Sequence, residues 1–214
     1  MIKKTISRSY RKINSIGFVS LNRYIIKRVY YAWLQKKYGF DKWHSATPFE
    51  ARAYKKGVVQ LASQLDVKSV VEIGCGLGEI ISRIDANERI GVDRELAVIK
   101  AARQLNKSKC KFFTMDLARF TEEFPNDHFE LLIMVNWIHE ISWKDLSQSI
   151  KDIQAKFDVK YLLVDSVDKA IDGFQNHHNE DKFSSLGPIV DMRLGLDFAR
   201  SLYIINIEKI NLSD

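Results

Sequence analysis

The chain has 214 residues, 46% hydrophobic and 28% charged, a balance that excludes a disordered protein and allows one well-buried core. Its two cysteines, Cys75 and Cys110, lie in no zinc-ligand spacing, so a structural zinc site is not expected. No run of about 18 apolar residues occurs, so we expect no membrane span and interpret the chain as cytoplasmic.

Positive charge is concentrated at the N-terminus. Residues 1–40 contain ten Lys or Arg residues and no Asp or Glu, whereas the remainder contains 23 basic and 27 acidic residues. This asymmetry predicts contact with something anionic: a membrane surface, a nucleic acid or an acidic substrate. We expect residues 1–40 to provide peripheral contact with an anionic inner membrane. The alternative is a helix packed on the core with a solvated basic face.

Two helices are predicted before the first strand. Residues 21–37 lack Gly and Pro and place Ile26, Val29, Trp33 and Leu34 at helical spacing. Residues 47–65 begin with Thr47, Pro48 and Glu50, which matches a capping box. These patterns predict a basic N-terminal helical extension over residues 1–64.

From residue 69 onward, short apolar strands alternate with helices, and near-continuous apolar strands are typical of a parallel sheet covered on both faces. The last two strand-like runs have too short a link for a helical crossover and should pair antiparallel. The fold class is therefore α/β, with a seven-stranded, mostly parallel sheet and a C-terminal antiparallel hairpin over residues 65–214. The expected strands are 69–74, 89–93, 111–115, 129–135, 160–165, 188–196 and 201–210, and the expected helices are 78–85, 95–105 and 143–156.

Three glycines, Gly74, Gly76 and Gly78, follow the first strand directly. A strand that turns tightly into a helix exposes backbone N–H groups, and glycines let a ligand approach them. A dinucleotide motif would need its third glycine at the position of Glu79. The carboxyl of Glu72 suits a cationic ligand better than a pyrophosphate. A nicotinamide-dependent dehydrogenase remains the last alternative.

The stretch "EIGCGLG" resembles the first motif of class I S-adenosylmethionine (SAM) dependent methyltransferases, E-x-G-x-G-x-G. The resemblance covers roughly residues 65–214 and includes the order of elements with a reversed last strand. It implies a Rossmann-like fold, SAM as cofactor and S-adenosylhomocysteine as product. Gly74, Gly76 and Gly78 would lie along the methionine part of SAM, and Glu72 would organise the loop.

Further cofactor-binding residues follow from the same resemblance. Asp93 would accept hydrogen bonds from the ribose hydroxyls, and Asp116, with Leu117 nearby, would contact the adenine amino group. Asn136 would lie at the carboxyl edge of the fourth strand, where ligands of open α/β sheets bind. Arg52 would meet the SAM carboxylate.

The loop after the fourth strand reads "VNWIHE". It lacks the N-P-P-Y-type sequence that is typical of enzymes that methylate the amino groups of adenine and cytosine. A hydroxyl acceptor needs its proton removed, and a neutral histidine does this near pH 7, so His139 is the predicted catalytic base, with Glu140 beside it. Trp43 and His44 are candidates for the acceptor pocket. The segment "HHNED", residues 177–181, is a polar surface loop or an acceptor loop.

The sequence therefore predicts a SAM-dependent methyltransferase that O-methylates a sugar, a glycan or another small hydroxyl acceptor, without a metal. The stretch "YGFDKWH" is similar to methyltransferases of bacterial surface-polysaccharide biosynthesis. Two alternatives stay open: an RNA or protein methyltransferase that uses the basic arm, and a non-catalytic SAM-binding protein. No oligomeric state is predicted.

Overall fold

The computed structural model describes residues 18–45, 48–107, 110–125, 128–197 and 199–208. Seven strands form one sheet in the order β3-β2-β1-β4-β5-β7-β6. The strands are β1 (Ser69–Ile73), β2 (Glu88–Asp93), β3 (Lys111–Thr114), β4 (His128–Met134), β5 (Asp158–Val167), β6 (Ile189–Leu196) and β7 (Arg200–Asn206).

The strand directions confirm the predicted topology. Strands β1 to β5 pair in parallel, and β7 pairs antiparallel with both β5 and β6. β7 is therefore the one reversed strand of the sheet. The chain builds β2 and β3 on one side of β1 and then β4 and β5 on the other. This reversal opens a crevice at the carboxyl ends of β1 and β4, the usual ligand position in open α/β sheets.

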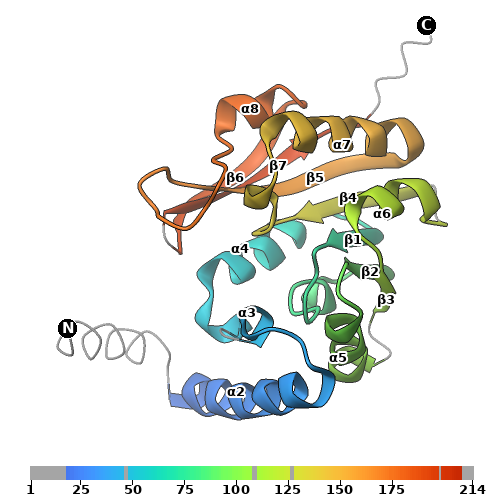
Figure 1. Ribbon diagram of the computed structural model, residues 1–214. Helices are drawn as coiled ribbons and strands as arrows, with labels where there is room; N and C mark the ends of the chain where they lie inside the picture. The colour runs from blue at the N-terminus through green and yellow to red at the C-terminus, as the bar shows by residue number, and fades with distance from the viewer. Residues whose placement is uncertain (1–17, 46–47, 108–109, 126–127, 198, 209–214) are drawn as a thin grey trace, which may run out of the picture.

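Helices cover both faces of the sheet, and Figure 1 shows the two helical layers. Adjacent strand residues point to opposite faces, so Val70 packs under α4 and α5, whereas Val71 packs under α6, α7 and α8. This two-sided burial explains the continuous apolar strands. The helices are α2 (Phe18–Tyr38), α3 (Lys42–Ser45), α4 (Ala53–Ala62), α5 (Leu96–Asn106), α6 (Leu117–Glu123), α7 (Trp143–Lys156) and α8 (Glu180–Ser184).

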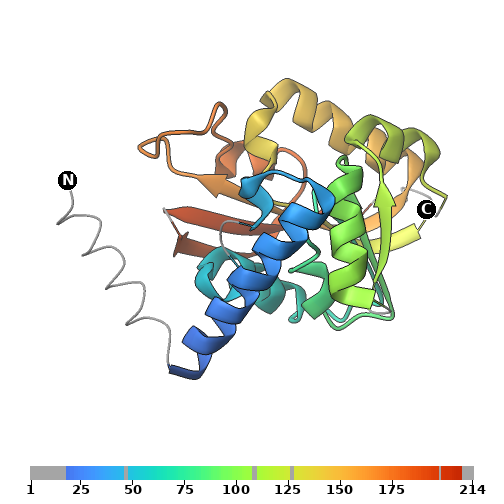
Figure 2. The same cartoon turned by 60° about the horizontal axis from the view of Figure 1, so that its bottom comes forward.

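The predicted helix at 21–37 is confirmed as α2, which lies outside α5 (Figure 2). Tyr31 and Leu34 of α2 are buried against Leu77, Val98 and Ala101. The described part of the extension thus packs on the core, and the boundary at residues 64 and 65 stays a prediction. None of the helices in the described ranges has the length and hydrophobicity to cross a membrane.

The predicted helix at 47–65 is wrong in its first part. Phe49–Ala51 form a short 3₁₀ helix, Arg52 is extended (φ −124°, ψ 109°), and α4 begins only at Ala53. The backbone N–H of Phe49 donates to Glu79 at 2.9 Å, so a tertiary contact takes up this segment's first amide. Thr47, the predicted N-cap, lies outside the described residues.

The predicted helix at 78–85 is also wrong, because only Ile81–Arg83 form a 3₁₀ turn there. In an α-helix the N–H of Ile81 would donate to the carbonyl of Leu77. Instead it donates to Glu72 Oε2 at 3.0 Å, and the Leu77 carbonyl accepts from the side chain of Asn106 at 2.9 Å. Both groups are thus committed to tertiary partners. The helices expected at 95–105 and 143–156 are confirmed as α5 and α7.

Candidate active site

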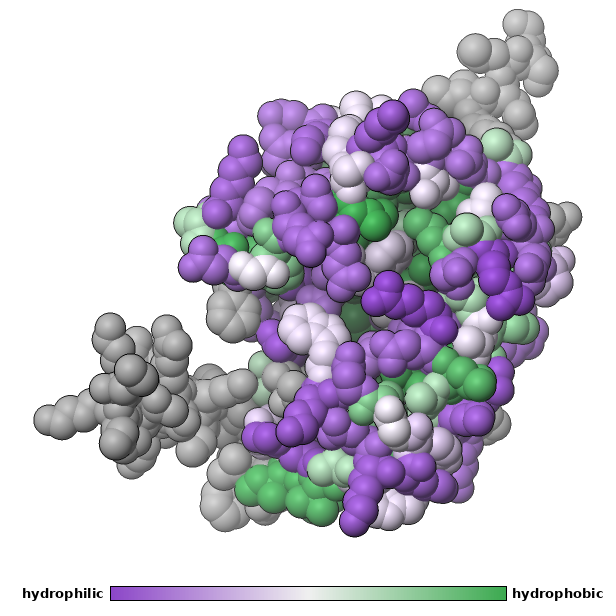
Figure 3. Space-filling view, viewed as in Figure 1, coloured by the Kyte–Doolittle hydropathy of each residue, from purple (hydrophilic) through white to green (hydrophobic). Residues whose placement is uncertain are grey.

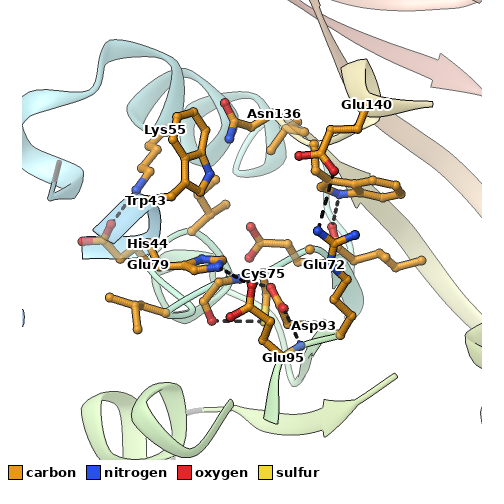
Figure 4. Close-up of a pocket in the computed structure, with 18 of the residues that line it drawn as sticks. Trp43, His44, Lys55, Glu72, Cys75, Glu79, Asp93, Glu95, Asn136 and Glu140 are labelled. Carbon is orange, nitrogen blue, oxygen red and sulfur yellow. Dashed lines mark hydrogen bonds and ion pairs between the residues drawn. The ribbon is translucent and has the colours of Figure 1, made fainter. Parts of the chain in front are cut away.

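A cavity of about 570 Å³ lies at the carboxyl ends of β1, β2 and β4. Residues of α3 and the start of α4 complete its wall, and Figure 4 shows Trp43, His44, Glu95, Asn136 and Glu140 around it. Its size is within the usual range for small-molecule and cofactor sites. Seven carboxyl side chains and three basic side chains line it, so the cavity favours a ligand that carries positive charge.

The three glycines of the loop after β1 have positive φ angles but three different neighbours. A Cβ at Gly74 would lie 2.2 Å from the Trp137 ring, and one at Gly78 would lie 2.7 Å from Phe112. At Gly76 the nearest atom is His44 Nδ1 at 3.3 Å. Gly74 and Gly76 line the cavity, and Gly78 does not. Gly78 is therefore required for packing within the loop.

Carboxyl groups hold this loop from two sides. Asp93, at the end of β2, accepts from the N–H of Gly76 at 2.9 Å through Oδ2 and from the N–H of Glu95 at 3.0 Å through Oδ1. Glu72 accepts from the N–H of Ile81. Burial raises the pKa of Glu72 to about 8, although the Ile81 amide opposes the shift. Glu72 is thus hydrogen-bonded to the loop and largely protonated at neutral pH, and its role in organising the loop around SAM stays a prediction.

Asp116 and Leu117 also line the cavity, where β3 leads into α6. The Asp116 carboxylate is the N-cap of α6 and accepts from the N–H of Arg119 at 2.9 Å. A carboxylate has further lone pairs, so this cap leaves acceptor capacity for a ligand. The predicted adenine contact is compatible with the cap and stays a prediction.

The cavity cover comes from the segment before the sheet. Trp43 and His44 of α3 line the cavity together with Arg52 and Tyr54, and their expected contact with the acceptor stays a prediction. His44 Nε2 lies 3.2 Å from Glu95 Oε1, so one ring nitrogen meets a carboxylate while the other faces Gly76. The sequence analysis did not find this histidine–glutamate pair, because 51 residues separate its members.

A buried polar network supports Asn136, the second residue after the end of β4. Asn136 has φ +76° and lines the cavity. Its N–H donates to Asp165 Oδ1 at 2.8 Å, and its side-chain oxygen accepts from Arg200 Nη2 at 3.0 Å. Arg200 also donates to Asp165 Oδ2 and lies 4.5 Å from the Tyr54 ring centroid. The network holds Asn136 in an unfavourable backbone conformation at the cavity wall.

The charge of Asp165 follows from the same network. Burial acts to raise the pKa of this carboxyl, but Arg200, His139 and the Asn136 N–H together hold it below the ordinary value. Asp165 and Arg200 are both almost fully buried, so they form a paired buried charge. The pairing of Asp165 with Arg200 was not predicted from the sequence, because 35 residues separate them.

His139 does not line the cavity. It is 1% exposed, and its Nε2 lies 3.2 Å from Asp165 Oδ2. Its position therefore favours a role in positioning Asp165 and Asn136, and its role as a catalytic base stays a prediction. Glu140, its neighbour, does line the cavity and pairs with Arg94 at 3.8 Å.

The segment "HHNED" is only in part the surface loop that was expected: Asn179, Glu180 and Asp181 are exposed, but the two histidines pack inward and α8 begins at Glu180. His178 is 1% exposed and lies 3.0 Å from the carbonyl of Ile138, while His177 contacts the carbonyl of Val167. Burial lowers the pKa of His178. This segment thus packs against the loop after β4, and Gly173 before it reaches the cavity wall.

Potential metal ligands come together at one place in the described ranges. Atoms of Asp41, His44 and Glu95 lie within 4.8 Å of one another. However, Asp41 already accepts from the backbone N–H groups of Trp43 and His44, at 2.9 and 3.3 Å. We therefore interpret these three side chains as part of the cavity wall. The expected absence of a metal stays a prediction.

Part of the sequence and the overall fold are similar to those of known methyltransferases. Residues 70–157 match a family model described as a methyltransferase domain. The structure resembles the N-methyltransferase NodS from Bradyrhizobium japonicum in complex with S-adenosyl-L-homocysteine, with a TM-score of 0.62 and 15% identity over 82% of this chain and 97% of that one. It also resembles magnesium protoporphyrin IX methyltransferase from Synechocystis with bound SAM, with a TM-score of 0.57 and 17% identity over 95% and 96% of the two chains.

No curated protein sequence matches the chain significantly. At the identities above, the solved structures show the fold alone, and the family model matches less than half of the chain. The match to the methyltransferase family model is confined to residues 70–157, and the solved structures show a Rossmann-like fold for the sheet that contains this segment.

Proposed function

We propose that the protein transfers a methyl group from SAM to a hydroxyl of a sugar, a glycan or another small acceptor. The observation that carries the SAM site is the bare, carboxylate-held loop at Gly76, which forms one wall of a predominantly acidic cavity. SAM supplies a methyl group on a positively charged sulfonium. Such a cation is compatible with a cavity in which carboxyl groups outnumber basic groups.

The cofactor residues predicted from the sequence give each part of SAM a partner. Gly74 and Gly76 line the cavity, with bare backbone at Gly76. Asp93 offers carboxylate oxygens for ribose hydroxyls, and Asp116 offers an acceptor for the adenine amino group. Arg52 lines the same cavity and is the proposed partner of the SAM carboxylate. Much of the rate advantage in such a transfer comes from alignment of donor and acceptor.

The remaining wall suggests the acceptor. Trp43 is 62% exposed although it lines the cavity, and Asn136 and Glu140 contribute hydrogen-bonding groups. A flat aromatic surface beside polar groups suits a sugar ring, which has apolar C–H faces and a polar edge. We therefore place a hydroxylated acceptor between Trp43 and the loop after β4.

Proton removal from the acceptor has two candidates. His44 lines the cavity, and Glu95 orients its ring through the 3.2 Å contact between Nε2 and Oε1. His139 is the candidate from the sequence and acts, in this geometry, through Asp165 and Asn136. We propose His44 as the base and His139 as a positioning residue.

Calorimetry tests the cofactor first. S-adenosylhomocysteine should bind and NAD should not, and binding of NAD alone would refute the proposal. Turnover is then followed by mass spectrometry with SAM and panels of sugars, sugar nucleotides, RNA oligonucleotides and peptides. Methylation of RNA or peptide alone would replace the proposed acceptor. Cofactor binding without turnover on any panel would favour a non-catalytic SAM-binding protein.

The same assay separates the two histidines. H44Q should reduce kcat by about 10²-fold or more and remove the base from its pH profile. H139Q should reduce activity without changing the position of that pH profile. Loss of the profile in H139Q but not in H44Q would return the catalytic role to His139.

A further inference from the structure

The outer face of α2 is apolar. Ile25, Ile26 and Val29 are 50%, 68% and 67% exposed, and Trp33 is 48% exposed. Figure 3 shows the corresponding hydrophobic patch at the lower edge of the molecule, over α2. At 100° per residue, these four side chains fall on one side of the helix. We call this surface the α2 face.

The exposure of the α2 face does not result from loose attachment of the helix. On the opposite side, Leu34 is fully buried and Tyr31 donates to Glu79 at 2.5 Å. Tyr38 donates to Gln104 of α5 at 2.5 Å, and Lys27 pairs with Glu50. These contacts fix the rotation of the helix. Val29 cannot turn inward without pulling Leu34 out of the core.

Positive charge surrounds the same face. Helix α2 contains no acidic residue, and the exposed side chains of Arg28, Lys36 and Lys37 lie along it. Lys37 lies 5.0 Å from the Trp33 ring centroid, and Tyr30 stacks on Trp33 at 5.5 Å. Exposed apolar and aromatic side chains with basic neighbours are typical of a helix that lies in the plane of a membrane interface.

We infer that the α2 face docks on an anionic lipid surface, with Ile26, Val29 and Trp33 entering the headgroup region. Charge complementarity selects this occupant. A partner protein would need an acidic surface around an apolar patch, and a second copy of α2 would bring like charges together. A leaflet with anionic lipids supplies negative charge and an apolar interior at once. The inference is independent of the methyl acceptor and of catalysis.

Sedimentation with lipid vesicles tests the inference on the full chain. The protein should bind vesicles of phosphatidylcholine mixed with phosphatidylglycerol, bind pure phosphatidylcholine far more weakly, and lose binding as salt increases. V29E should weaken binding about tenfold or more, because a carboxylate enters the interface and repels the lipid. R28Q and K36Q should each weaken it by up to about fivefold.

L194E is the matched control, since Leu194 on β6 is 62% exposed and lies away from α2. It should leave vesicle binding unchanged, and thermal melts should show that both variants fold. Absence of wild-type binding to anionic vesicles would overturn the inference, as would equal losses in V29E and L194E. Concentration-dependent dimerisation that V29E abolishes would also overturn it, because the face would then be occupied by a second copy.

Discussion

Replacing Glu72 by Gln tests whether the buried carboxyl beside the glycine loop is protonated in the folded protein. Its pKa is about 8 in the fold and has the ordinary value of 4.5 when solvated, because burial disfavours the charged form. Between pH 4.5 and about pH 8, Glu72 is ionised in the unfolded chain and protonated in the folded one, so folding takes up a proton there. Because the folded pKa is the higher one, the associated stability is complete at low pH and is lost as pH rises through about 8.

The magnitude follows from the linkage relation. Each pH unit in this window lowers the free energy of unfolding of the wild type by about 1.4 kcal/mol through Glu72. Between about pH 5.5 and about pH 7.5 the effect is about 2 to 3 kcal/mol. Glu72→Gln cannot titrate, although its amide oxygen still accepts from Ile81. The variant should therefore gain stability relative to the wild type by this amount as pH rises.

Urea unfolding at several pH values measures this difference. Glu122→Gln is the control, because Glu122 is exposed on α6 and its replacement should leave the pH dependence unchanged. Saturating SAM should flatten the wild-type slope, because a nearby cation lowers the pKa of a carboxyl. If the wild type and Glu72→Gln differ by a constant amount at every pH, Glu72 ionises normally and the argument fails.

Two further predictions address the loop and the buried network. Gly74→Ala should destabilise the fold by about 1–3 kcal/mol in thermal melts, because its Cβ would lie 2.2 Å from Trp137. Gly76→Ala should retain more stability and lose more affinity for S-adenosylhomocysteine in calorimetry, and the reverse order would contradict the assigned neighbours. Arg200→Met should cost about 3–5 kcal/mol in urea unfolding, because Asp165 would be left as a buried, partly unpaired charge. Adding Asp165→Asn should recover part of that loss, and strict additivity of the two substitutions would argue against the pair.

The periodic segments were predictable because their local patterns agree with their final environment. The apolar runs that became β1, β4 and β5 are buried on both faces, and α5 and α7 bury one side each. The prediction at residues 78–85 was wrong because the helix-forming amide and carbonyl at Ile81 and Leu77 have partners elsewhere in the fold. Local propensity carries no information about such partners.

The residues that line the cavity were also predictable only in part. The glycine spacing located the loop, and eight of the ten predicted site residues line the cavity, whereas Gly78 and His139 do not. A sequence pattern gives the position of a glycine but not the atom it faces, so Gly78 could not be distinguished from Gly76. His139 was predicted from its distance after the fourth strand, but the direction of its side chain depends on Asp165 in another strand.

The sequence by itself determined the strand order along the chain, the reversed last strand, the glycine loop and the basic character of the N-terminal segment. These features depend on residue type and on periods of two or 3.6 residues, which act locally. The tertiary structure alone decided that Trp137 covers Gly74, that Arg200 pairs with Asp165 and that His44 meets Glu95. Those contacts join residues far apart in the chain, and sheet register and helix packing bring them together only once the core has formed.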